Sequence, residues 1–276
     1  MERESAAGGR APDNSHAAGL VAVLLIIYLF AYLDRQIISL LVEPLKADLQ
    51  ISDIDVSFLQ GAAFVIFYTL FGLPIGFLVD RLPRRPIIFA GILFWSLASA
   101  ASGLAQTYDQ LLLARFGVGA GEAALLPTAY SMIGDAVSRQ RLSRAISVFS
   151  LGAIGGGALA LTLGGYLVKA ATDMGGVSLP WLGPVAGWQL VFLVIGMLGI
   201  PASLLIFLVP EPARKISATT SGATGNPRGP SHLRLHLRFY FFHIAGFSIM
   251  CLVMAGNAAW QPAFIQRAFG WNIAQV

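Results

Sequence analysis

The chain has 276 residues, of which 56% are apolar and only 12% are charged. A soluble globular domain carries about 25% charged residues, so this composition excludes an ordinary water-soluble domain. The single cysteine, Cys251, excludes a disulfide framework and a zinc site built on paired cysteines. The net charge is +4, and only the positions of the charged residues along the chain can show which partner this charge indicates.

Seven mostly apolar stretches follow one another along the chain. Each is close to the ~20 residues that a helix needs to cross a bilayer. They are residues 17–42, 56–79, 86–108, 110–134, 145–168, 188–209 and 239–266. We therefore predict an all-α membrane protein, with a six-helix bundle over residues 20–210 and one further transmembrane helix within residues 239–276.

Two polar segments mark the boundaries of this arrangement. Residues 1–16 are Gly/Ala-rich and lack a charged-then-apolar leader pattern, so we predict a disordered cytoplasmic tail over residues 1–19. Residues 216–231 are rich in Ser, Thr, Gly and Pro, which is typical of a flexible linker. The predicted cytoplasmic linker spans residues 211–238.

Lys and Arg residues gather in alternate connections between the apolar stretches, which sets the orientation in the membrane. The connections after the second, fourth and sixth stretches hold Arg81, Arg84, Arg85, Arg139, Arg141, Arg144, Arg214, Lys215, Arg228, Arg234 and Arg238. The other connections hold only Lys46 and Lys169. We expect a cytoplasmic amino terminus, a location in the plasma (inner) membrane and no nucleic acid partner.

Four charged residues lie inside the apolar stretches, namely Asp34, Arg35, Arg115 and Glu122. Each costs about 3 kcal/mol at a helix centre, so each needs a partner or a wet cavity. A rise of about 1.5 Å per residue places the first three in the outer half of the membrane and Glu122 nearer the midplane. Arg115 and Glu122 share a helix face with Gly119 between them, and Pro127 favours a kink beside Glu122 because it lacks an N–H.

This charge pattern favours transport chemistry. A carboxyl group at mid-depth beside a cation can carry a proton, and two arginines can hold an anionic head group by paired hydrogen bonds. The alternative is an ion-pair network that only locks the first and fourth stretches together.

Small residues also recur at helical spacing. They form one line in the fifth stretch (Gly152, Gly156, Ala160, Gly164) and another in the second (Tyr68, Gly72, Gly76, Asp80). Such lines let helices approach closely, so we predict close helix packing along both.

The segment from Gly76 to Arg85 reads GFLVDRLPRR. It resembles the signature loop of the major facilitator superfamily at each family position: Gly76, Asp80, Arg81, Arg84 and Arg85. The resemblance implies a transporter fold of two six-helix halves, in which these residues form a cytoplasmic gate. On this basis residues 20–210 are one half, and residues 239–276 are the truncated start of the other.

Further segments are similar to the Spinster-like branch, including YLDR at 32–35, AFVIFY at 63–68, RFGVGAGEA at 115–123 and WQPAF at 260–264. The resemblance implies proton coupling through Asp34 and Glu122. Arg35 and Arg115 would bind the substrate and tune the carboxyl pKa values. Expected substrates are a lysolipid, a sphingolipid-like amphiphile or a small organic anion. In contrast to many drug exporters, residues 150–167 lack a proline, which argues against antiport by that family motif.

We considered three alternatives to a transporter. An intramembrane serine protease needs a Ser/His pair inside the membrane, and the sequence argues against it because His243 is the only histidine inside an apolar stretch. A retinal protein needs a lysine in its last helix, which residues 239–266 lack. A partial chain that folds without transporting is the third, since alternating access needs two halves. We predict neither enzymatic activity nor a metal or cofactor.

Overall fold

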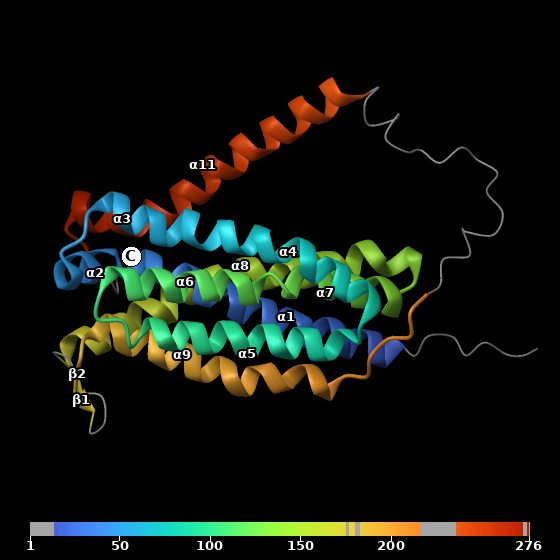
Figure 1. Ribbon diagram of the computed structural model, residues 1–276, viewed down its shortest axis with the longest axis horizontal. Coiled ribbons are helices and arrows are strands. Elements are labelled where there is room, and N and C mark those ends of the chain that lie inside the picture. The colour runs from blue at the N-terminus through green and yellow to red at the C-terminus, as the bar shows by residue number, and fades with distance from the viewer. Residues whose placement is uncertain (1–13, 175–176, 180–182, 216–235, 273–274, 276) are drawn as a thin grey trace, which may run out of the picture.

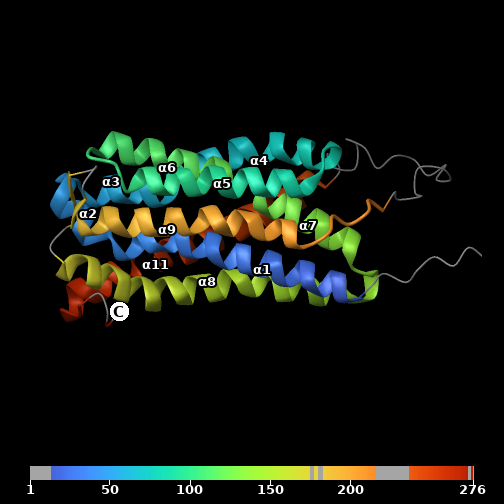
Figure 2. The same ribbon diagram turned by 90° about the horizontal axis from the view of Figure 1, so that it is seen from below.

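The computed structural model describes residues 14–174, 177–179, 183–215, 236–272 and 275, which form a bundle of long helices and one helix that leaves it (Figure 1, Figure 2). Most of the predicted tail and most of the predicted linker lie outside the described residues. Within the described part, α1 already begins at Asn14, six positions before the predicted start of the bundle.

The elements follow the predicted order. They are α1 (Asn14–Ile37), η1 (Ile38–Leu40), α2 (Val42–Leu49), α3 (Asp53–Ser57), the π-helical turn η2 (Phe58–Ala62), α4 (Ala63–Arg81), α5 (Arg84–Ser102), α6 (Tyr108–Glu122), α7 (Leu125–Ala136), α8 (Arg139–Asp173), β1 (Val177–Leu179), β2 (Gly183–Val185), α9 (Gly187–Ser203), η3 (Leu204–Leu208) and α11 (Leu237–Phe269). Strands β1 and β2 pair antiparallel between α8 and α9.

Seven helical segments of the described chain are long and apolar enough to cross a membrane. They are His16–Leu40, Asp53–Arg81, Arg84–Ser102, Tyr108–Ala136, Arg139–Ala171, Gly187–Leu208 and Leu237–Phe269. The all-α membrane fold predicted from the sequence is therefore confirmed. We call the end of the bundle that carries α2 and α3 the α2 end, and the opposite end the Arg84 end (Figure 1).

Local sequence signals set several helix boundaries. The Ser52 hydroxyl accepts from the backbone N–H of Asp55 while the Asp55 carboxylate accepts from the N–H of Ser52, which caps α3. The third helix ends at Ser102 rather than near Tyr108, because a turn at Gly103 packs against α9 and Thr107 then caps α6.

Glycines on α8 let it pack closely against α1. A Cβ on Gly152 would lie 2.8 Å from the carbonyl oxygen of Leu25, and one on Gly156 would clash with the carbonyl oxygen of Leu29. The predicted packing line in the fifth stretch is confirmed. The line in the second stretch has no such packing in the described residues, since no atom outside its own helix lies within 4 Å of a Cβ on Gly72 or Gly76.

The fourth stretch is broken, as Pro127 predicted. Helix α6 ends at Glu122 and α7 starts at Leu125, with Ala123 and Ala124 in a turn between them. Pro127 cannot donate to the carbonyl of Ala123, which removes one helical bond at this point. Glu122 is thus the last residue of α6 before this break.

Within the described residues, helix α11 meets the bundle near the α2 end and diverges from it toward the Arg84 end (Figure 1). Ala263 packs there against Val42 and Val56, with Trp260 beside them. The first two thirds of α11 expose large apolar side chains such as Phe242 and Leu252.

Candidate functional site

The four charged residues predicted from the sequence lie on two helices inside the bundle. Asp34 and Arg35 lie near the end of α1, and Arg115 and Glu122 lie on α6. The exposed fractions of Asp34, Arg115 and Glu122 are 1%, 3% and 2%, whereas 29% of the Arg35 side chain is exposed. Three of the four charges are therefore buried in an apolar bundle, which requires partners for each.

Arg35 and Glu122 form an ion pair that joins α1 to α6. The Arg35 Nε donates to Glu122 Oε2 at 3.2 Å, and an Arg35 Nη2 group donates to the same oxygen. The second carboxylate oxygen, Oε1, is buried and has no hydrogen-bond partner among the described residues. The carboxylate is thus fixed by one oxygen and free to bind through the other.

Helix α5 supplies partners for the remaining two charges. The Ser99 hydroxyl donates to Asp34 Oδ1 at 2.7 Å, and Arg115 Nη2 donates to the Ser102 hydroxyl at 3.2 Å. Ser99 and Ser102 are three residues apart and therefore share a face of α5. Asp34 and Arg115 interact electrostatically across this face.

Unpartnered polar atoms remain at this centre. Within the described residues, Asp34 Oδ2, Arg115 Nε and Glu122 Oε1 are buried without a hydrogen-bond partner. Buried polar groups are nearly always bonded, so each such atom calls for an explanation, such as a ligand, a water molecule or a proton. The geometry therefore fits a centre that binds something polar.

Glycines on α6 set the position of these charges. A Cβ on Gly119 would lie 2.5 Å from the carbonyl oxygen of Phe64 on α4, and one on Gly121 would lie 2.7 Å from the backbone nitrogen of Trp95 on α5. These glycines therefore let α6, which carries Arg115 and Glu122, pack closely on α4 and α5.

The signature segment divides into buried and exposed parts at the Arg84 end. Arg84 is fully buried; it pairs with Asp135 on α7 and with Glu211, and it bonds Ser131. Gly76 is half-buried, and Asp80 and Arg81 are exposed. Arg85 donates to the carbonyl oxygen of Phe207 at 2.7 Å.

Residues 211–215, which follow η3, bind to the same end of the bundle through hydrogen bonds. Arg214 donates to the carbonyl oxygens of Val79 (2.7 Å) and Leu82 (2.6 Å), at the end of α4. Lys215 donates to the carbonyl oxygen of Val137 (2.7 Å), after α7. Residues 211–215 therefore satisfy the free carbonyls of two helix ends, and none of these contacts was predicted from the sequence.

A second charged cluster joins α11 to the α2 end. Arg267 donates to Glu43 at 2.7 Å and to both oxygens of Asp53 at 3.0 and 2.8 Å, and Lys46 donates to Asp53 at 2.7 Å. Nothing in the sequence indicated that Arg267 would have these partners.

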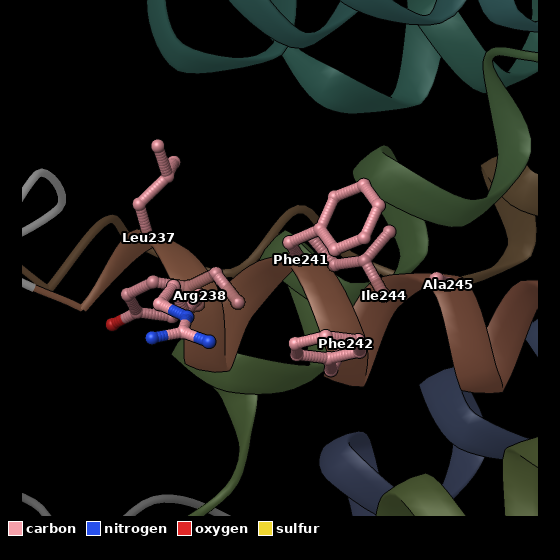
Figure 3. A pocket seen from close by; sticks show the side chains of 7 residues that line it. Leu237, Arg238, Phe241, Phe242, Ile244 and Ala245 are labelled. Carbon is pink, nitrogen blue, oxygen red and sulfur yellow. The ribbon is translucent and has the colours of Figure 1, made fainter.

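A cavity lies at the start of α11. Among the described residues it is lined by Leu237, Arg238, Tyr240, Phe241, Phe242, Ile244 and Ala245 (Figure 3). It lies apart from the buried charges. In the described part of the chain, no three His, Cys, Asp or Glu residues lie close enough together to hold a metal ion.

The chain matches the family profile of the Major Facilitator Superfamily over residues 24–276. It belongs to this family. The chain is 27% identical to an MFS-type efflux pump of Mycolicibacterium smegmatis, over 96% of its own length and 58% of that protein. It is 29% identical to protein spinster homolog 1 of Bos taurus, over 93% of its own length and 47% of that protein.

Its fold is similar to the crystal structure of a bacterial homolog of the human lysosomal transporter Spinster, in an inward-facing and unoccupied conformation. The TM-score is 0.82 at 28% identity, over 94% of this chain and 57% of that one. The Spinster-like resemblance of the sequence is confirmed. The chain spans about half the length of the curated relatives it matches.

Proposed function

We propose that this chain forms one six-helix half and the first helix of the other half of a proton-coupled secondary transporter. Major facilitator transporters enclose a central site between two such halves and move substrate by alternating access. The observation that carries the proposal is the ion pair of Arg35 with Glu122, in which Glu122 Oε1 stays buried and unpartnered.

In this proposal Glu122 and Asp34 carry the proton. A carboxylate that loses its charge on protonation can move through an apolar space at a lower energetic cost. Glu122 lies directly before the break between α6 and α7, so a change in its pairing with Arg35 acts at the junction of these two helices.

Arg35 and Arg115 bind the substrate in the same proposal. Guanidinium groups recognise carboxylates and phosphates by paired hydrogen bonds, which suits a lysolipid, a sphingolipid-like amphiphile or a small organic anion. The partly exposed side chain of Arg35 and the unpartnered Nε of Arg115 are available for such bonds.

We also propose the orientation that the basic residues indicate, with the Arg84 end in the cytoplasm of the cell and the α2 end outside. The signature residues Gly76, Asp80, Arg81, Arg84 and Arg85 then form a cytoplasmic gate, and Arg267 closes the outer side.

Proton coupling is tested on the purified chain in weakly buffered detergent with a pH-sensitive dye. Lysophosphatidylcholine and gluconate are added separately, and we expect one of them to change the dye signal. The change should disappear in Glu122→Gln and persist in Asp173→Asn, an exposed carboxylate paired with Lys169. A signal that is unchanged in Glu122→Gln contradicts the proton role of Glu122.

Transport itself is tested with the complete transporter in liposomes under an imposed pH gradient. Glu122→Gln should abolish pH-driven uptake while the protein still folds. Uptake that keeps its pH dependence contradicts the assignment.

A further inference from the structure

Three aromatic rings surround the guanidinium group of Arg35. Its central carbon lies 4.3 Å from the ring centroid of Phe64, 5.3 Å from that of Tyr32 and 5.6 Å from that of Tyr68. The Phe64 and Tyr68 rings stack on each other with centroids 5.4 Å apart. We call Tyr32, Phe64 and Tyr68 the aromatic cage.

Phe64 is held in the cage by its backbone. It is buried, and its carbonyl oxygen lies where a Cβ on Gly119 would approach to 2.5 Å. Only glycine at 119 therefore allows this approach of α4 to α6. Glu122 follows Gly119 by three residues, so one helix contact places both the ring and the carboxylate around Arg35.

This arrangement addresses a physical difficulty of the proposed function. When Glu122 takes up a proton, the partly exposed Arg35 loses the counter-charge that holds it against the apolar bundle, and the loss of one partner from such a pair is destabilising. The face of an aromatic ring attracts a cation, most strongly where water is excluded. While the Glu122 carboxylate is charged, it partly offsets the attraction between the rings and Arg35, because the negative face of an aromatic ring repels an anion.

We propose that the aromatic cage, with Phe64 at its centre, is a positioning device that keeps Arg35 in place when Glu122 is neutral. Glu122 can then exchange its proton without displacement of Arg35. The inference rests on the proposed proton role of Glu122. The other titratable or charged groups that interact with the pair are Asp34, Tyr28 and Tyr32 from α1, Arg115 from α6 and Tyr68 from α4.

The test is the coupling between Phe64 and the charge at position 122. Equilibrium unfolding of the purified chain in detergent is measured for Phe64→Leu, Glu122→Gln and the double variant. Because Glu122→Gln imitates the neutral carboxyl, we expect Phe64→Leu to lower the folded-to-unfolded ratio about tenfold more in the Glu122→Gln background than in the unchanged chain. A purely structural role for Phe64 gives equal factors in both backgrounds and overturns the proposal.

Phe67 provides the matched control. It lies on the same helix and stacks on Phe116 with centroids 4.2 Å apart, and it is not among the rings that face the Arg35 guanidinium group in the described residues. Phe67→Leu should lower the folded-to-unfolded ratio by the same factor in the unchanged chain and in the Glu122→Gln variant. Phe64→Trp keeps a ring face under Arg35 and should restore most of the ratio in the Glu122→Gln background; a failure to restore it contradicts the role of the ring.

A second pair of variants applies if Phe64→Leu does not fold. Tyr68→Leu removes a ring of the cage, and Tyr68→Phe keeps it. Tyr68→Leu should lower the folded-to-unfolded ratio by a larger factor in the Glu122→Gln background than in the unchanged chain, whereas Tyr68→Phe should lower it by the same factor in both. Equal factors for Tyr68→Leu in the two backgrounds overturn the proposal. This measurement is separate from proton-driven uptake, so the cage and the proton role can fail independently.

Discussion

Arg267, in the last turn of α11, forms a two-bond ion pair with Asp53, the first residue of α3, at 3.0 and 2.8 Å. The two residues are 214 positions apart in the sequence. The same guanidinium also bonds Glu43 on α2. This cluster is a polar connection between α11 and the bundle in the part of the chain that the structure describes, and it lies where α11 makes its apolar contact through Ala263.

The first prediction concerns this connection. Arg267→Glu places three carboxylates together, so α11 should separate from the α2 end. Spin labels at Leu70 on α4 and Leu252 on α11, both exposed, should then report a broader distance distribution by pulsed electron paramagnetic resonance. Adding Asp53→Arg should narrow it again. Arg238→Glu, at the exposed start of α11, is the control and should change nothing.

The second prediction concerns the signature segment. Arg84 is fully buried between Asp135 and Glu211, and removal of one partner from a buried pair costs about 3–5 kcal/mol. Arg84→Ala should therefore reduce the free energy of unfolding by about 3 kcal/mol in detergent. Arg81→Ala, three residues earlier and exposed, should change it little. Similar losses for both variants would show that the segment is not held by Arg84.

The third prediction compares two adjacent glycines of α8. A Cβ on Gly156 would clash with the backbone of Leu29, whereas one on Gly157 has open space within the described residues. Gly156→Ala should lower the free energy of unfolding by about 1–3 kcal/mol, since overpacking forces α1 and α8 apart. Gly157→Ala should be neutral or slightly stabilising, because alanine is the better helix former. A larger loss of unfolding free energy for Gly157→Ala than for Gly156→Ala would contradict the close contact of α1 with α8 at Gly156.

The fourth prediction compares two buried serines of α5. Ser99 donates to the carboxylate of Asp34, while the hydroxyl of Ser96 has no partner among the described residues. Ser99→Ala should lower the free energy of unfolding by about 1.5–3 kcal/mol, the range for a hydrogen bond to a charged group. Ser96→Ala removes only an unsatisfied hydroxyl and should be neutral or stabilising. Thermal unfolding of both variants, measured side by side, checks the order.

Much of the fold follows from the sequence for one reason. A bilayer requires each crossing segment to satisfy its own backbone, so long apolar stretches are helices. The break at Ala123 was predictable because Pro127 lacks an N–H. The exact ends of the helices were less predictable. Helix α5 ends at Ser102 because the turn at Gly103 packs against α9, and the local sequence holds no signal for that contact.

The glycine lines show the same limit. Gly152 and Gly156 pack on α1, whereas Gly72 and Gly76 face open space in the described chain, although the two lines have the same spacing. Spacing defines a face of a helix, but only the neighbouring helix decides whether that face is covered.

The sequence by itself singled out four charges. Asp34, Arg35, Arg115 and Glu122 stand out because ionised groups are costly in an apolar helix. Only the tertiary structure decided their partners. Arg115 shares a helix face with Glu122, yet Glu122 pairs with Arg35 from α1, and Arg115 bonds Ser102 from α5. Partner choice depends on how far and at what rotation α1, α5 and α6 approach one another. The glycines at 119 and 121 set the close approach of α6 to α4 and to α5.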